Sequence, residues 1–213
     1  MCKDCTNVEM GFTSDKFPRG THMCYIYNDD EEREAIISKF LGAGLKENEK
    51  VVYFAHEKNK PEMLDMMGKE GVELSGEELD HFFVAKAMDT YCPTGKFELE
   101  TMVDGLTGFY QGAIAEGYSG VRVSGEMQWA LEHKPGTERL MEYESLGDIV
   151  LKPNPLTLIC QYDARKFDGA TLLNCLKVHP YMIVRGQIVQ NPYYMTHEEF
   201  MEEYRKNGGS GEK

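Results

Sequence analysis

The feature that most constrains the fold of this chain is a regular alternation of short apolar runs with amphipathic segments. Each apolar run is rich in β-branched and aromatic residues, as strands are, and each amphipathic segment carries apolar residues at helical spacing. The expected strands are 21–27, 51–55, 82–87, 121–125 and 156–162. Strands that alternate with helices predict a three-layer α/β fold, in which a mostly parallel sheet has helices on both faces.

The segments between and after these strands define the expected helices. They are expected at about 29–41, 61–67, 97–116, 137–149, 170–177 and 197–206. After residue 180 the rhythm changes, because 181–184 and 187–189 are two strand-like runs joined by Arg185-Gly186. A tight turn between two such runs predicts a C-terminal antiparallel hairpin at the edge of the sheet.

The regular pattern occupies most of the chain but not its ends. Residues 1–16 show no clear period, so we expect an N-terminal arm there. One domain is expected over 17–206, because no repeat and no linker interrupts the alternation. The Gly-rich run over 207–213 predicts a flexible tail.

Charge and hydropathy exclude several classes of partner. Acidic residues number 36 and basic residues 23, which gives a net charge of −13. A field of this sign repels nucleic acid and anionic membranes, so we expect no direct contact with either. The sequence has no run of 18 apolar residues, and its polar N-terminus does not resemble a signal peptide. We therefore expect a cytoplasmic protein.

The turn after the first strand is where many α/β proteins bind phosphate, and here it is acidic. The segment reads Asn28-Asp29-Asp30-Glu31-Glu32, whose carboxylates would repel a triphosphate. No dinucleotide-binding glycine pattern and no G-x-S-x-G nucleophile motif is present in the sequence. We therefore expect no nucleotide cofactor bound by the usual loop, and no cofactor of another kind is indicated.

Polar and aromatic residues follow the fourth and fifth strands, at the edge where parallel sheets bind ligands. Glu126 and Trp129 come after the fourth strand, and Tyr162 and Asp163 end the fifth. Structural roles are equally open, with Glu126 or Asp163 as a helix cap and Trp129 in the core. His22 begins the first strand, so it is expected at the opposite end of the sheet from Glu126.

Six cysteines occupy positions 2, 5, 24, 92, 160 and 175. The four internal ones are expected to be buried thiols. Cys2 and Cys5 form a C-x-x-C pair, but a zinc site needs about four ligands, so they are only weak metal candidates. Two alternatives to a binding module stay open. One is an enzyme with Glu126 as general base, assisted by His179 or Asp163, and the other is a thiol or metal sensor using Cys2, Cys5 and Cys24.

Several segments together resemble one family. They are 20–27 (GTHMCYIY), 116–127 (EGYSGVRVSGEM), 160–163 (CQYD), 179–180 (HP) and 191–194 (NPYY). In this order and spacing they are similar to the MEDS domain, the methanogen/methylotroph DcmR sensory domain, over about residues 17–195. The resemblance implies a RecA/KaiC-like core without its phosphate loop. It also implies a sensor of small hydrocarbon derivatives, such as halogenated or methylated one-carbon compounds, and not an enzyme.

The resemblance also implies which residues contact the ligand and what receives the signal. The recurrent His, Glu, Tyr and Asp positions of the family fall on His22, Glu126, Tyr162, Asp163 and His179, and Tyr25 and Trp129 complete the candidate ligand-binding residues. Relatives are often joined to a helix-turn-helix domain or a histidine kinase, and this sequence contains neither. The expected partners are therefore a small organic ligand, a separate histidine kinase or transcription regulator, and a second copy of the chain in a homodimer. The ligand is expected in an apolar pocket lined by Met127 and Trp129, and the signal is expected to pass through the C-terminal helix.

Overall fold

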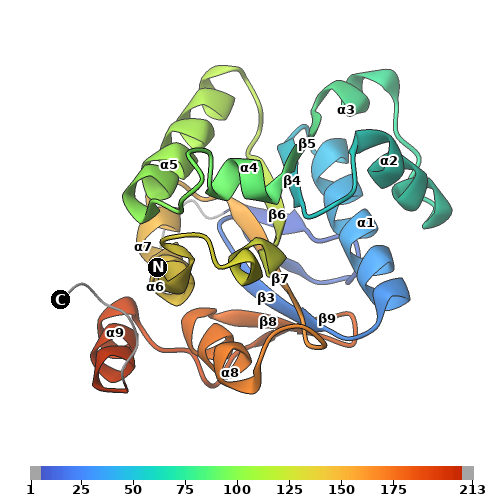
Figure 1. The fold of residues 1–213 in the computed structure, drawn as a ribbon. Helices are drawn as coiled ribbons and strands as arrows, with labels where there is room; N and C mark the ends of the chain where they lie inside the picture. The colour runs from blue at the N-terminus through green and yellow to red at the C-terminus, as the bar shows by residue number, and fades with distance from the viewer. Residues whose placement is uncertain (1–5, 208–213) are drawn as a thin grey trace.

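A seven-stranded sheet runs through the middle of the computed structural model, which describes residues 6–207 (Figure 1). Its order is β5-β4-β6-β7-β3-β8-β9. The strands are β3 (His22–Tyr27), β4 (Lys50–Ala55), β5 (Phe82–Lys86), β6 (Val121–Glu126), β7 (Thr157–Asp163), β8 (Tyr181–Val184) and β9 (Gln187–Gln190). All neighbours pair in parallel except β8 and β9, which form the antiparallel hairpin. The predicted sheet and hairpin are therefore confirmed.

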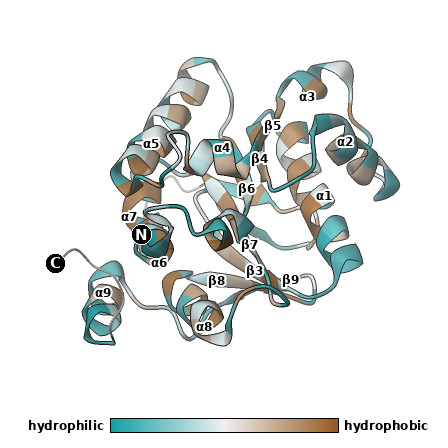
Figure 2. Cartoon of the chain, viewed as in Figure 1, coloured by the Kyte–Doolittle hydropathy of each residue, from teal (hydrophilic) through white to brown (hydrophobic). Residues whose placement is uncertain are grey.

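Helices cover both faces of this sheet, as the alternation predicts. One face is covered by α1 (Asp30–Lys46), α2 (Lys60–Lys69) and α3 (Gly76–Asp80). The other is covered by α4 (Ala87–Tyr91), α5 (Leu99–Ala115), α6 (Leu140–Ser145), α7 (Gly147–Leu151) and α8 (Gly169–Val178). A last helix, α9 (His197–Lys206), packs against α6 and α8. Each face has its own hydrophobic cluster, and Figure 2 shows hydrophobic residues on the central strands.

The turn from β3 into α1 shows why no phosphate loop forms there. The Asp29 carboxylate accepts a hydrogen bond from the Glu32 backbone N–H at 2.9 Å, so it caps the helix. Asp30, Glu31 and Glu32 follow in the first turn, where the helix dipole stabilises negative charge. One of the backbone N–H groups at the start of this helix, where phosphates often bind, is therefore used by the protein's own carboxylate.

Two predicted features differ from the structure. In the expected arm, β1 (Asn7–Glu9) pairs antiparallel with β2 (Lys16–Pro18), which begins at the last residue of the arm, and the buried Val8 anchors the pair. The expected continuous helix over 137–149 is wrong, because it divides into a 3-10 turn (Thr137–Arg139), α6 and α7. The last turn of α6 tightens where Leu146 N–H donates to the carbonyl of Tyr143.

Some elements of the structure were not predicted from the sequence, and one predicted segment lies mostly outside the described part of the chain. The short helices α3 and α4 and the 3-10 helix η1 (Met127–Glu132) were not predicted. The expected tail over 207–213 lies outside the described residues apart from Asn207, so the domain limits stay predictions. Within residues 6–207, no helix is both long enough and apolar enough to span a membrane.

Candidate functional site

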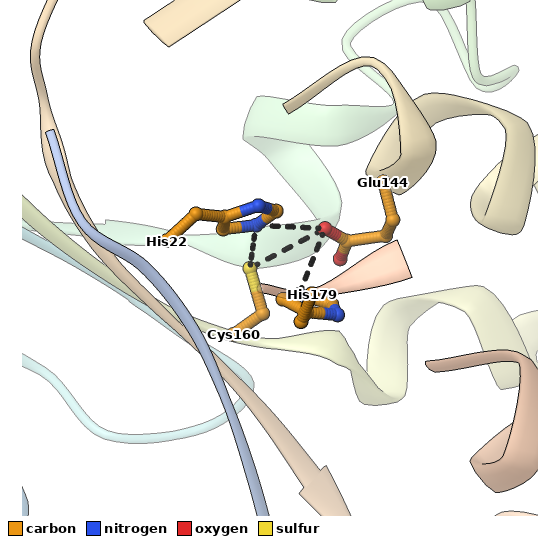
Figure 3. A group of neighbouring side chains, drawn as sticks. All are labelled: His22, Glu144, Cys160 and His179. Atoms are coloured by element: carbon orange, nitrogen blue, oxygen red, sulfur yellow. Dashed lines mark hydrogen bonds and ion pairs between the residues drawn. The ribbon is translucent and has the colours of Figure 1, made fainter. Parts of the chain in front are cut away.

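Four polar side chains from distant parts of the chain meet in the interior, on the face of the sheet covered by α6 and α8 (Figure 3). They are His22 at the start of β3, Glu144 on α6, Cys160 in β7 and His179 just after α8. Glu144 lies at the centre. Its Oε2 is 3.5 Å from His22 Nε2, 3.4 Å from His179 Nε2 and 3.4 Å from Cys160 Sγ. We call these four residues the Glu144 cluster.

Neighbouring groups hold the members of the Glu144 cluster in place. The Tyr162 hydroxyl donates to Glu144 Oε1 at 2.8 Å. His179 Nδ1 lies 2.8 Å from the carbonyl oxygen of Cys175, which can only accept, so Nδ1 carries the proton. Gly147 lies against the His22 ring, where a Cβ atom would collide with it. The break between α6 and α7 therefore places a glycine at the point where the imidazole needs room.

Burial and proximity set the charges within the Glu144 cluster. Burial acts to raise the pKa of Glu144, but His179 and His22 outweigh it and hold the pKa below its usual range. Burial acts to lower the pKa of His179, and Glu144 reverses this and raises it to about 9. For His22, burial and the neighbouring His179 lower the pKa. Burial and then Glu144 raise the pKa of the Cys160 thiol. In the free protein the cluster is thus a Glu144–His179 ion pair beside a neutral imidazole and a thiol.

A small cavity of about 30 Å³ adjoins the Glu144 cluster. Its apolar wall comes from β6, β7, α5 and α7, and includes Val103, Leu106, Val123, Val150, Leu151 and Leu158. His22, Glu144 and Cys160 also line it, and provide its polar part. A cavity of this volume holds about two or three water-sized groups. It is therefore of a size for a one-carbon molecule with a polar or polarisable substituent.

A second, polar cavity of about 480 Å³ lies at the carboxyl ends of the strands, on the α1 face. Arg33 of α1 donates to Tyr53 Oη at 3.1 Å and lies 3.6 Å from Glu126. The Tyr53 hydroxyl donates to Glu126 at 2.6 Å. Asp163 also lines this cavity and is hydrogen-bonded by Arg165. Arg33 is paired with Glu126, and Arg165 with Asp30 and Asp163, so these charged groups already have partners within the protein.

The Asp163–Arg165 pair at this cavity predicts that the stability of the fold decreases at acidic pH. Hydrogen bonds from the Arg165 side chain lower the pKa of Asp163, so the pair stabilises the fold above about pH 4, the usual carboxyl pKa, and loses this effect as the pH falls. We expect Arg165→Gln to raise the Asp163 pKa toward its ordinary value. Carboxyl ¹³C NMR titration measures it. Asp168 is the internal control, because its pKa is lowered by Thr171 and should not move.

The structure divides the predicted ligand-binding residues between the two faces of the sheet. Side chains alternate along a strand, so Tyr162 and Gln161 point to opposite faces. His22, Tyr162 and His179 lie on the face of the Glu144 cluster. Tyr25, Glu126 and Asp163 lie on the α1 face. The register also confirms that His22, beside Leu158, lies toward the opposite end of the sheet from Glu126, beside Gln161.

This division separates Glu126 from His179, one of the two assisting residues of the enzyme hypothesis, whereas Asp163, the other, lines the same cavity as Glu126. Trp129 and Met127 are fully buried in the core, where Trp129 stacks on Tyr91 with ring centroids 4.4 Å apart. The cavity beside the Glu144 cluster is lined by Tyr91 and by neither of those two residues, so a ligand pocket lined by Met127 and Trp129 stays a prediction.

The metal candidates named from sequence are not tested by the structure, and stronger ones were missed. Cys2 and Cys5 lie outside the described residues. Cys24 is buried on the face of the Glu144 cluster, near Cys175 and His179. Glu144 and Cys160 were not singled out, because Glu144 sits among the acids of a predicted helix and Cys160 is one residue of an apolar strand. No local spacing reveals either, since their partners are distant in sequence.

Solved structures define the class of fold. The KaiC-like protein PH0186 of Pyrococcus horikoshii OT3 is 14% identical, with 84% of this chain and 80% of that chain covered and a TM-score of 0.55. The flagellar accessory protein FlaH of Methanocaldococcus jannaschii is 8% identical, with coverage of 87% and 84% and a TM-score of 0.57. The chain therefore has a KaiC/RecA-like fold, with acid where such proteins bind phosphate.

Sequence comparison then identifies the family. Residues 21–180 match the model described as MEDS, the MEthanogen/methylotroph, DcmR Sensory domain, and the chain belongs to this family. The transcriptional repressor DcmR of Methylorubrum extorquens (strain DM4) is 26% identical over 159 residues. That match covers 74% of this chain and 57% of DcmR, so the chain spans little more than half the length of this relative. The predicted family is confirmed, and with it a sensory or regulatory role.

Proposed function

We propose that this chain senses a small hydrocarbon derivative of one-carbon size, which it binds in the cavity beside the Glu144 cluster. The observation that carries the proposal is the cavity itself: about 30 Å³, apolar over most of its wall, and ending on His22, Glu144 and Cys160. Apolar pockets with a few convergent polar groups are typical binding sites for small molecules. The family description, a sensory domain of methanogens and methylotrophs, supports the same class of ligand.

An apolar groove on the surface offers a route into this cavity. The groove has a volume of about 460 Å³ and lies between α5 and the strands β4, β5 and β6. It shares four lining residues with the inner cavity: Phe54, Tyr91, Leu106 and Val123. A rotation of one of these side chains would join the two spaces. An uncharged hydrocarbon derivative would partition into such a groove, whereas a charged metabolite would not.

The packing around Glu144 suggests how binding would be reported. Glu144 and Ser145 are neighbours on α6, and Ser145 Oγ lies 2.8 Å from Nδ1 of His197, the first residue of α9. Tyr194, just before α9, hydrogen-bonds Asp148 on α7. A ligand that displaces Glu144 would therefore shift α6 against the C-terminal helix, where a partner such as a histidine kinase or transcription regulator would detect it. We propose sensing rather than turnover, because the family is described as a sensory domain and His179 lies on the opposite face of the sheet from Glu126.

Filling the cavity tests the binding site. We expect dichloromethane or methanethiol to raise the thermal midpoint of the wild-type protein, because a ligand that binds only the folded state stabilises it. Val123→Ile places one methylene in the cavity and should weaken this binding by about tenfold or more. Thermal unfolding at increasing probe concentration measures both effects.

Val121→Ile is the matched control, because Val121 is buried on the same strand and the same face but does not line the cavity. It should respond to the probes as the wild type does. Equal responses from the two variants, or a midpoint that no probe shifts, would refute the proposed site.

A further inference from the structure

We propose that the Glu144 cluster is a metal site, in which His22 Nε2, Glu144 Oε2, Cys160 Sγ and His179 Nε2 bind one divalent ion of the zinc class. The inference deepens the proposed function, since the ion would occupy the polar part of the ligand cavity. It can nevertheless be tested with the metal alone, without any organic ligand.

The spacing of the four donor atoms carries the geometric part of the inference. Zinc bonds of about 2.0–2.3 Å in a tetrahedron place the ligand atoms about 3.3–3.6 Å from one another. Glu144 Oε2 is 3.5 Å from His22 Nε2 and 3.4 Å from His179 Nε2. Cys160 Sγ is 3.4 Å from Glu144 Oε2 and 3.6 Å from His22 Nε2. All four atoms lie within 4.8 Å of one another, so small side-chain rotations complete the site.

The orientation of His179 is a second, independent indication. Its Nδ1 proton is directed to the Cys175 carbonyl oxygen, which is the usual outer contact of a metal-binding histidine and fixes its tautomer. Its Nε2 is fully buried and has no hydrogen-bond partner among the described residues, although Glu144 Oε2 is near. A metal ion that displaces the Nε2 proton of His179 would take the lone pair of this nitrogen, and Glu144 Oε2 lies 3.4 Å away, close enough to bind the same ion.

The charge balance of the buried site fits a divalent ion. Two neutral imidazoles, one carboxylate and one thiolate carry a charge of −2, so the complex with a divalent metal is neutral. A neutral complex is the form that costs least to bury, and all four residues are buried or nearly so. Metal entry would release two protons, one from the Cys160 thiol, which binds as the thiolate, and one from Nε2 of His179.

The donor set also selects the kind of metal. Imidazole and thiolate suit zinc, iron and similar borderline ions, whereas magnesium and calcium prefer oxygen ligands. A neighbouring group, Cys24, Cys175 and His179, shares the same histidine. In that group His179 would use Nδ1, which lies 3.8 Å from Cys175 Sγ but is already hydrogen-bonded to a carbonyl oxygen. The Glu144 cluster is therefore the favoured site.

Cobalt(II) is the spectroscopic probe that tests the site. We expect one Co²⁺ per chain to bind the metal-free wild-type protein and to produce both a tetrahedral visible spectrum and a thiolate-to-cobalt charge-transfer band. One equivalent of Zn²⁺ should displace it. Cys160→Ser should lose the charge-transfer band, and His179→Gln should reduce the affinity by about 10-fold to 100-fold or more, judged from the cost of removing even outer-shell partners.

Cys175→Ser is the matched control, because this buried thiol lies near the same histidine but is not one of the four ligands. It should keep the full charge-transfer band. Because the first readout uses the wild-type chain, a variant that fails to fold does not decide the result. Wild-type protein that binds no Co²⁺ or Zn²⁺, or a band that survives in Cys160→Ser and disappears in Cys175→Ser, would overturn the site. Metal binding without a response to dichloromethane would instead count against the proposed ligand and leave the metal site standing.

Discussion

Replacing Arg122 with Met is expected to lower the free energy of unfolding by about 3–5 kcal/mol, because it leaves a buried carboxylate without its main partner. Arg122 and Glu49 are both completely buried, with Arg122 Nε 2.6 Å from Glu49 Oε2. Arg122 also donates to the carbonyl oxygen of Phe40 at 2.8 Å, so it ties β6 to α1. In the variant, Glu49 keeps one charged partner, Arg19, whose Nη2 lies 3.4 Å from Glu49 Oε1. Denaturant unfolding of the variant measures the loss.

A double variant separates the loss of the pair from the cost of the charge left behind. Arg122→Met combined with Glu49→Leu removes both charges, and it should recover much of the stability lost in the single variant. Glu116→Gln is the surface control, since Glu116 is 55% exposed in its ion pair with Lys50, and it should cost about 1 kcal/mol or less. A single variant as mild as this control would mean that water reaches Glu49.

The second large effect is expected for Glu144→Ala, measured in metal-free protein. The substitution removes the acceptor of the Tyr162 hydroxyl and leaves the His179 imidazole without its counter-charge. The imidazole can release its proton, so the loss should lie near the lower end of the range for a broken buried pair, about 3 kcal/mol. Urea unfolding at neutral pH measures this effect.

Glu142→Ala is the comparison for Glu144, because it lies on the same helix and pairs with Arg139 nearer the surface. It should cost about 1 kcal/mol or less. If the two variants lose equal stability, the Glu144 carboxylate is not the organising centre of the site. If Glu144→Ala also shows no binding of dichloromethane at any concentration tested, the ligand cavity and the cluster share one structure, as the shared lining residues indicate.

The Glu144 cluster and the polar cavity near Glu126 lie on opposite faces of the KaiC/RecA-like sheet. The cavity at the carboxyl ends of the strands keeps the position of the usual ligand site, but its Arg33 and Glu126 are paired with each other. The proposed ligand cavity lies instead between the sheet and α5 to α7. A sensor of uncharged molecules needs an apolar enclosure more than it needs a phosphate cradle.

The sequence by itself determined the architecture of this protein. Apolar runs of strand length, separated by segments of helical period, specify a parallel sheet covered on both faces, and the Arg185-Gly186 turn specifies the hairpin. The acidic residues 29–32 likewise exclude a phosphate loop without any knowledge of the structure. These features are local, because hydrophobic period, turn residues and helix capping each act over a few neighbouring residues.

The tertiary structure alone decided where the site lies. His22, Glu144, Cys160 and His179 come from four elements and share no sequence spacing, so only the packing of α6 and α8 on the sheet brings them together. Strand geometry determined which face of the sheet each side chain on a strand points to. Since consecutive side chains on a strand point to opposite faces, Tyr162 joins Glu144 while its neighbours Gln161 and Asp163 face α1. Residues that are adjacent in the sequence therefore belong to different sites, because side chains alternate between the two faces of a strand.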